Sequence, residues 1–253
     1  MSAAGARPIR LIALTGIPLV EPGDDLAAQI FEAAREAGIP LREGVVVVCQ
    51  KIVSKAEGRL VDLRSVEPRP EAREIAAEGD KDPRQVEVVL RESARIVRRA
   101  PGVLICQTRH GFVCANAGVD LSNANVEEQA ILLPEDPDAS AERLRRGLEA
   151  LGAEQVAVVV CDTFGRPWRE GLVDVALGSS GIAPIADARG SEDLSGRELQ
   201  VTAMATVDQL AAAAGLLMVK DAGVPAVWIE GVAPEGDGTT RELVRDPATD
   251  LFR

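Results

Sequence analysis

The sequence has no tyrosine and one histidine, and its aromatic residues make up 2% of the chain. Stacking platforms for nucleobases and aromatic-lined ligand grooves are therefore not expected. Catalysis by a pair of histidines is excluded, because the chain has one. The formal net charge of −12 argues against a nucleic-acid surface or an anionic membrane as partner, since both require a basic face.

The sequence also lacks long apolar runs, because its longest uninterrupted aliphatic segments are too short to cross a bilayer. Residues 1–25 place two arginines before an apolar run, as a secretory signal does, but no small-x-small cleavage site follows. We interpret this segment as a first strand. Four cysteines lie in or beside apolar stretches without C-x-x-C spacing, namely Cys49, Cys106, Cys114 and Cys161. We expect buried thiols in a reducing cytoplasm, with a redox pair of Cys106 and Cys114 across a hairpin as the alternative.

The 253 residues are 46% hydrophobic, contain no internal repeat, and predict one unit spanning residues 1–253. Helical periodicity predicts helices from Asp24 or Asp25 to Gly38, from Asp82 to Pro101, from Ser140 to Gly152, and over about 206–222. Strands are predicted over 9–14, 45–49, 103–108, 112–115, 156–161 and 226–229, with surface loops at 64–71 and 134–139. Strands that are apolar on both faces need cover on both sides. The prediction is a mixed α/β or α+β fold with helices over the sheets.

Three predicted strands run directly into polar residues. VVVVC is followed by Gln50 and Lys51, FVCA by Asn116, and VAVVVC by Asp162 and Thr163. Ligands of α/β proteins collect at the carboxyl ends of strands, because the chain leaves the core there and can present polar groups at a fixed position. These ends are the predicted site.

Asp120 and Asn123 follow one of these strand ends within a few residues. If the ends adjoin, Asp120, Asp162 and Thr163 form an oxygen-rich site suited to Mg²⁺ or Mn²⁺, which would bridge nucleotide phosphates. The alternative is that these residues are ordinary turn formers that bond their own backbone.

Arg166 and Arg169 follow the second acidic group closely, and Arg189 and Arg197 lie downstream. Arginine forks match phosphate and carboxylate oxygens, so this cluster in an acidic chain favours an anionic substrate beside the metal. The alternative is pairing of each arginine with a neighbouring carboxylate on the surface.

Lys51 and Lys55 could reach a phosphate, or could be solvated. The sequence has no G-x-x-x-x-G-K-S/T motif, so any nucleotide is bound without a P-loop. His110, between two predicted strands, is interpreted as a residue of a hairpin turn and not as a catalytic base.

Several of these segments together resemble one family. GIPLVEPGDDL, IVSKAEGR, RHGFVCANAGVDLSN, LLPEDPDASAERLR, CDTFGRPWREG and GRELQVT are similar to the coenzyme F420 γ-glutamyl ligases, CofE, over about 14–231. The resemblance implies a two-lobed α/β subunit in an intertwined homodimer. It also implies that GTP, with divalent Mg²⁺ or Mn²⁺ and possibly K⁺, drives γ-linked addition of L-glutamate to coenzyme F420-0 and F420-1. Some relatives carry a C-terminal reductase domain; we expect none here, and ligase activity alone.

The same resemblance assigns residues by motif. Nucleotide contacts fall on Ile17, Pro18, Leu19, Val20, Gln50, Lys51, Lys55, Asn123, Met218 and Lys220. Metal ligands fall on Asp120 and Asp162 for one cation and Thr163 for a second. Catalytic roles fall on Lys55, Asp120 and Asp162. Binding of the acidic substrates falls on Arg166, Arg169 and Arg189.

The sequence departs from the family pattern at two places. Gln50 replaces a hydroxyl residue, and Val219-Lys220 replaces a glycine followed by an acidic or amide residue near the second metal, with Asp221 as a possible substitute. The expected reaction runs through an acyl phosphate formed on the γ-phosphate of GTP. The alternatives are an amide ligase acting on another carboxylate, and a protein that binds nucleotide or metal without catalysis.

Overall fold

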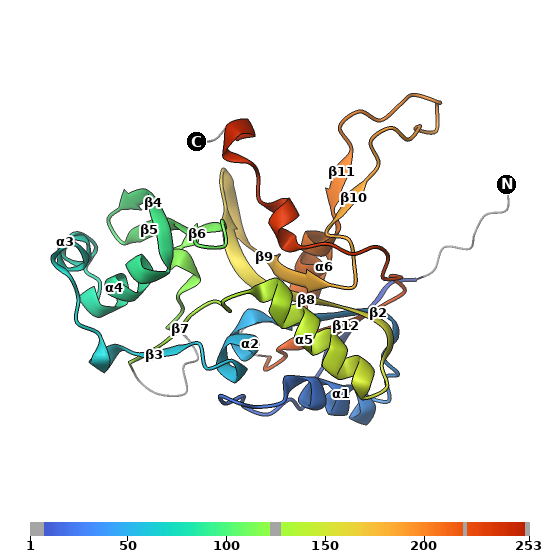
Figure 1. The fold of residues 1–253 in the computed structure, drawn as a ribbon, viewed down its shortest axis with the longest axis horizontal. Helices are drawn as coiled ribbons and strands as arrows, with labels where there is room; N and C mark the ends of the chain where they lie inside the picture. Colours follow the sequence, from blue (N-terminus) through green and yellow to red (C-terminus); the bar gives the residue numbers. More distant parts are fainter. Residues whose placement is uncertain (1–7, 122–127, 220–221, 251–253) are drawn as a thin grey trace.

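The computed structural model describes residues 8–121, 128–219 and 222–250. Its centre is a mixed sheet with the strand order β1-β12-β2-β8-β9 (Figure 1). The strands are β1 (Arg10–Leu14), β12 (Ala226–Glu230), β2 (Arg42–Cys49), β8 (Glu154–Arg166) and β9 (Arg169–Ser180). Strand β12 runs antiparallel to β1 and β2, and β2 runs parallel to β8. The strands β1, β2 and β8 therefore point the same way and end at the same edge.

Helices cover both faces of this sheet, because the valine runs of its central strands alternate between two cores. On one face Val46, Val48 and Val158 pack with residues of α1 (Leu26–Glu36) and α5 (Pro137–Ala150). On the other face Val47 and Val159 pack with residues of α6 (Thr206–Gly215). The expectation of apolar strands covered on both sides is confirmed.

A second group of elements lies beside the main sheet, to the left in Figure 1. It contains the antiparallel sheet β4 (Ser93–Ala100), β5 (Val103–Thr108) and β6 (Val113–Ala115), with helices α3 (Pro70–Gly79) and α4 (Pro83–Glu92). The short pair β3 (Leu60–Asp62) and β7 (Gln129–Ile131) and the 3₁₀ turns η1 (Leu63–Ser65) and η2 (Asn116–Gly118) complete it. Its core is separate and includes Ile75, Val86, Val89 and Leu104.

The remaining elements are peripheral. The hairpin β10 (Ile185–Asp187) and β11 (Ala203–Ala205) carries a long excursion away from the sheet, and η3 (Thr240–Leu243) and η4 (Pro247–Thr249) lead to the C-terminus (Figure 1). No helix in the described ranges combines the length and the apolar character needed to cross a membrane.

Most predicted elements are confirmed, with their ends moved by a few residues. Helix α1 begins after Asp25, whose side chain accepts a hydrogen bond from the amide of Ala28. The hairpin turn at His110 is closed by the Thr108 amide, which donates to the Phe112 carbonyl at 2.8 Å. Helix α5 begins at Pro137 behind the cap Asp136, because a proline fits the first helical turn, and not at Ser140.

Four boundary predictions are wrong. The helix predicted from Asp82 to Pro101 ends at Glu92, because the β-branched segment after it pairs with β5 as strand β4. The helix predicted over 206–222 ends at Gly215. The predicted loop over 64–71 contains part of η1 and the start of α3. Strand β8 continues five residues past its predicted end at 161, to Arg166, because it forms a long hairpin with β9, which was not predicted.

The cysteines are free thiols, and three of the four are fully buried. Cys106 and Cys114 face each other across β5 and β6. Burial raises the pKa of the Cys114 thiol to about 12. Because reactive cysteines have lowered pKa values, the structure favours inert thiols over the redox pair.

Candidate active site at the carboxyl edge of the main sheet

The edge where β1, β2 and β8 end carries the polar residues that the sequence singled out. Helix α2 (Gln50–Ala56) begins immediately after Cys49 of β2, so Gln50 and Lys51 lie in its first turn. The Lys51 Nζ atom forms an ion pair with Asp120 Oδ2 at 2.5 Å. This contact joins the end of β2 to a segment from the second group of elements.

Asp120 is held in place by its backbone. Its amide donates to the Ile131 carbonyl at 3.0 Å, and the Ile131 amide donates back to the Asp120 carbonyl at 2.8 Å. The Lys51–Asp120 ion pair brings Asp120 to the end of β2, although by a different route from the one the sequence suggested. The strand before Asp120, β6, belongs to the second sheet and not to the main one.

Asp162 is a half-buried carboxyl group on β8, and its pKa is raised to about 7. Withdrawal from water is the largest cause, and the charges of Asp120 and Asp174 raise the pKa further. The backbone amide of Thr163 and the ammonium group of Lys51 act in the opposite direction. Asp162 therefore feels the charges of both Asp120 and Asp174, and we call these three residues the acidic cluster.

Asp174 is the member of the acidic cluster that the sequence analysis missed. It lies opposite Thr163 on β9, and the Thr163 hydroxyl donates to its Oδ1 atom at 2.6 Å. Gly215 at the end of α6 allows this packing, because a Cβ atom there would lie 2.0 Å from Asp174 Oδ2. The signal for Asp174 was the pair of extended runs on either side of the turn-forming GRPW segment.

The basic side of the site is also partly withdrawn from water. Lys55 is 6% exposed, and burial followed by the charge of Lys51 lowers its pKa. Gln50 is fully buried and accepts a hydrogen bond from the Ser54 hydroxyl at 2.8 Å. The amide nitrogen of Gln50 is buried without a hydrogen-bond partner in the described part of the chain. It is therefore available to an acceptor atom of a ligand.

The chemistry of these donors fits a hard divalent cation. Carboxylate and hydroxyl oxygens are the ligands that Mg²⁺ and Mn²⁺ prefer. A bound cation also offsets the repulsion between neighbouring half-buried carboxylates. Over the described ranges, no three His, Cys, Asp or Glu side chains are close enough together to hold a metal by themselves. Here Asp120 is engaged by Lys51 and Asp174 by Thr163. Water and phosphate oxygens would have to complete the coordination.

The other predicted nucleotide contacts surround this edge where they are described. Ile17 packs on the core below the loop after β1, Leu19 is 82% exposed, and Val20 is buried. Pro18 is exposed on the same loop. Met218 follows α6 and packs on the opposite core. Asn123 and Lys220 lie outside the described residues, as does Asp221.

The structure separates the predicted substrate arginines. Arg166 and Arg169 face each other at the tip of the β8–β9 hairpin, and Arg166 Nη2 donates to the Glu170 carbonyl at 2.9 Å. Arg189 forms an ion pair with Asp187 at 2.5 Å on the β10–β11 excursion, as the surface-pairing alternative predicted for it. Among the described residues, no contact joins Arg189 to the acidic cluster.

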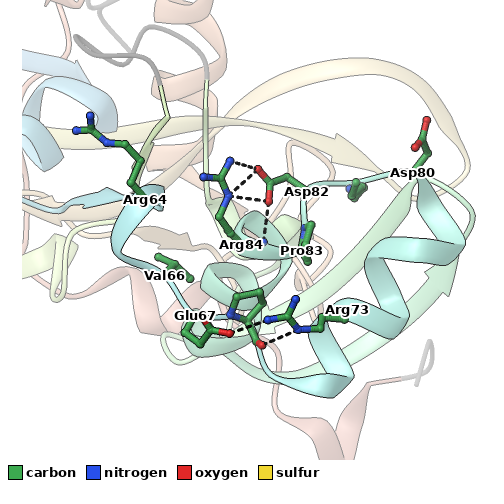
Figure 2. Close-up of a pocket in the computed structure, with 10 residues that line it drawn as sticks. Arg64, Val66, Glu67, Arg73, Asp80, Asp82, Pro83 and Arg84 are labelled. Carbon is green, nitrogen blue, oxygen red and sulfur yellow. Dashed lines mark hydrogen bonds and ion pairs between the residues drawn. The ribbon is translucent and has the colours of Figure 1, made fainter.

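The described part of the chain includes two cavities that are large enough for a small molecule. A cavity of about 780 Å³ lies among η1, α3 and α4 (Figure 2). Its charges largely satisfy one another, since Arg84 pairs with Asp82 and Arg73 with Glu67, each at 2.7 Å. It contains none of the predicted site residues. A second cavity, of about 770 Å³, lies between the β8–β9 hairpin, the second sheet and the C-terminal segment.

Comparison with known proteins identifies the family. The sequence profile of the family described as F420-0:Gamma-glutamyl ligase matches residues 16–231. The chain is 47% identical over 251 residues to the coenzyme F420:L-glutamate ligase of Methanothermobacter thermautotrophicus, covering 97% of this chain and 99% of that protein. It is 49% identical over 241 residues to the ligase of the same name from Methanopyrus kandleri, covering 92% of this chain and 93% of the relative. The ligase of that name from Methanocaldococcus jannaschii is 39% identical over 250 residues, covering 98% of each chain. The chain belongs to the F420-0:Gamma-glutamyl ligase family.

Proposed function

We propose that this protein is a GTP-dependent ligase that joins the amine of L-glutamate to the terminal carboxylate of coenzyme F420-0, and of F420-1, in γ-linkage. The observation that carries the proposal is the acidic cluster beside Lys51 at one sheet edge. Carboxylates that can hold a cation, next to lysines that can neutralise phosphate charge, support phosphoryl transfer to a carboxylate. The names of the relatives supply the acceptor and the amino acid.

The nucleotide would lie over the carboxyl ends of β1 and β2. Lys51 and Lys55 would neutralise its phosphate oxygens, and the buried amide nitrogen of Gln50 would donate to one of them. The loop over residues 17–20 would contact the nucleoside. No P-loop is needed, since the lysines come from a helix that begins at the strand end.

The reaction would proceed in two steps. The acceptor carboxylate attacks the γ-phosphorus of GTP, the bond to the β-phosphate oxygen breaks, and GDP leaves. The glutamate amine then attacks the acyl carbon of the resulting acyl phosphate, phosphate leaves, and the nitrogen loses a proton as the amide forms. Lys51 and Lys55 would stabilise the charge that develops on the transferred phosphoryl group.

Asp120 and Asp162 would hold one divalent cation, and Thr163 with Asp174 the second. Such cations, when bound, neutralise phosphate charge. The chain's own part is to keep its oxygen donors fixed: Asp120 by its backbone pairing with Ile131, and Thr163 by its hydrogen bond to Asp174. We also propose a homodimer working in the cytoplasm.

The test is incubation with F420-0, L-glutamate, Mg²⁺ or Mn²⁺, and either GTP or ATP. The product should gain the mass of one glutamate residue per GTP hydrolysed. With ¹⁸O in the acceptor carboxylate, one ¹⁸O atom should appear in the released phosphate. Glutamate transfer to a different carboxylate only would favour another amide ligase. Nucleotide binding without phosphate release, with every acceptor offered, would favour a binding protein.

A further inference from the structure

The second cavity is the strongest unassigned feature of the molecule. Its volume of about 770 Å³ lies in the range of small-molecule sites. Its floor includes Cys114, Val175 and Ala176, and Val175 is the cross-strand partner of Asp162. The cavity therefore lies against the strand pair that carries Asp162.

Aromatic side chains gather around this cavity although the chain has few of them. Phe112, Phe164 and Trp168 line it, and they are three of the six Phe and Trp residues in the sequence. The Phe112 and Phe164 rings meet edge to face, with centroids 6.5 Å apart. The expectation that so few aromatics leave no aromatic-lined cavity is therefore wrong.

Strand geometry places one of these rings on the same face of β8 as Asp162. Asp162 and Phe164 are two residues apart on β8, so their side chains share one face of the strand. The second sheet packs toward this face, as the contact between the Phe112 and Phe164 rings shows. A planar ligand against these rings would place a flexible tail within reach of Asp162.

Four arginines line the same cavity in a chain with a net charge of −12, namely Arg95, Arg98, Arg166 and Arg245. None of them forms an ion pair with a carboxylate of the described residues. Arg95 donates to the Gln107 side chain at 2.7 Å, and Arg166 donates to a backbone carbonyl. The Nε atom of Arg166 is buried with no hydrogen-bond partner in the part of the chain that is described.

The cavity also contains two carboxyl groups, so its arginines outnumber its acids. Asp208 accepts a hydrogen bond from the amide of Ala176 at 2.9 Å, and Asp250 lies near the C-terminal end. Most arginines elsewhere are paired, as Arg99 is with Glu78 at 2.5 Å. Unpaired guanidinium groups around an aromatic cavity indicate an anionic aromatic ligand.

In the order of strands across the main sheet, the nucleotide loops lie on one side of β8, which carries Asp162, and the cavity lies on the other. The loops follow β1 and β2, and the cavity is bounded by β8, β9 and β6. We propose that this cavity binds the acceptor, a planar polycyclic heteroaromatic with an anionic tail, and delivers the terminal carboxylate to Asp162 opposite the nucleotide. This inference rests on the proposed function, since that function supplies an acceptor of this chemistry.

The experiment measures the affinity for two ligands separately by titration calorimetry, with F420-0 in one series and Mg²⁺–GTP in the other. The test variant is Arg98→Ala combined with Arg245→Ala, two exposed side chains whose loss should leave folding intact. The control is Arg99→Ala, which removes one positive charge from the next residue of β4 outside the cavity. A further variant, Phe164→Leu, tests the aromatic wall.

The double variant should weaken F420-0 binding about tenfold or more and leave the affinity for Mg²⁺–GTP unchanged. Phe164→Leu should weaken F420-0 binding selectively, and Arg99→Ala should change neither affinity. If the double variant binds F420-0 as wild type does, while wild type makes glutamylated product, the inference is wrong and the proposed function stands. If wild type neither binds nor glutamylates F420-0, the inference and the proposed function are both wrong. If the double variant loses both ligands together with a change of oligomeric state, the cavity is an interface between copies and the inference is overturned.

Discussion

Replacement of Asp162 by asparagine should make the metal-free protein more stable at alkaline pH while abolishing its activity. The carboxyl group has a pKa of about 7 in the folded protein and one of about 4 in an unfolded chain. Between those values the unfolded state has lost the proton and the native state still holds it. The free energy of unfolding of wild type therefore falls as pH rises from about 4 to about 7, and then levels off.

The size of the effect follows from the shift. Three pKa units correspond to about 4 kcal/mol, which is an upper bound because the side chain is only half-buried. We expect the free energy of unfolding of Asp162→Asn to exceed that of wild type by about 1–3 kcal/mol at pH 8.5, and by roughly half of that at pH 5.5. Urea unfolding in EDTA at the two pH values measures the difference.

The control is Asp187→Asn, since pairing with Arg189 lowers the pKa of the exposed Asp187 carboxyl group to about 2. That variant should show no gain at alkaline pH. Mg²⁺ should raise the stability of wild type at pH 8.5 and leave Asp162→Asn unchanged. An Asp162→Asn protein that is no more stable than wild type at pH 8.5, or whose gain does not grow with pH, would refute the electrostatic account of the site.

Three further changes test the account. Asp120→Asn removes the partner of Lys51 and a donor to the cation, and should lower kcat by several orders of magnitude with the circular dichroism spectrum unchanged; normal turnover would contradict the site assignment. Gly215→Ala places a methyl group against Asp174 and should cost about 1–3 kcal/mol of stability, measured by urea unfolding, and reduce activity; an unchanged urea midpoint would contradict this packing. Lys55→Met should weaken Mg²⁺–GTP binding about tenfold or more in calorimetry, and an unchanged affinity would remove this residue from the nucleotide site.

The sequence predicted four of the five strands of the main sheet, because those strands carry their own signal. The valine runs of β2 and β8 are apolar on both faces, and such runs are stable only between two layers of helices. Their common direction put Gln50, Lys51 and Asp162 at one edge.

The parts that the sequence did not predict depend on pairing between distant segments. The periodicity that begins at Val86 fits a helix through Val97, but the second half pairs with β5, and backbone pairing across the sheet outweighs helical propensity. Asp174 was missed because it enters the site only through the β8–β9 hairpin. The Asp187 partner of Arg189 is two residues away, a local pair that the sequence analysis did consider.

The most direct test of the central claim, that separate strand ends meet to form a glutamate ligase site, is the rate of glutamate addition to F420-0 by wild type and by Asp162→Asn. Both are measured with GTP and Mg²⁺ at pH 8.5 and followed by mass spectrometry, with Glu67→Gln as a control carboxylate whose side chain is 90% exposed. The account predicts product from wild type and Glu67→Gln, and a loss of several orders of magnitude in Asp162→Asn although that variant is folded and more stable. Equal rates in the three proteins would contradict it.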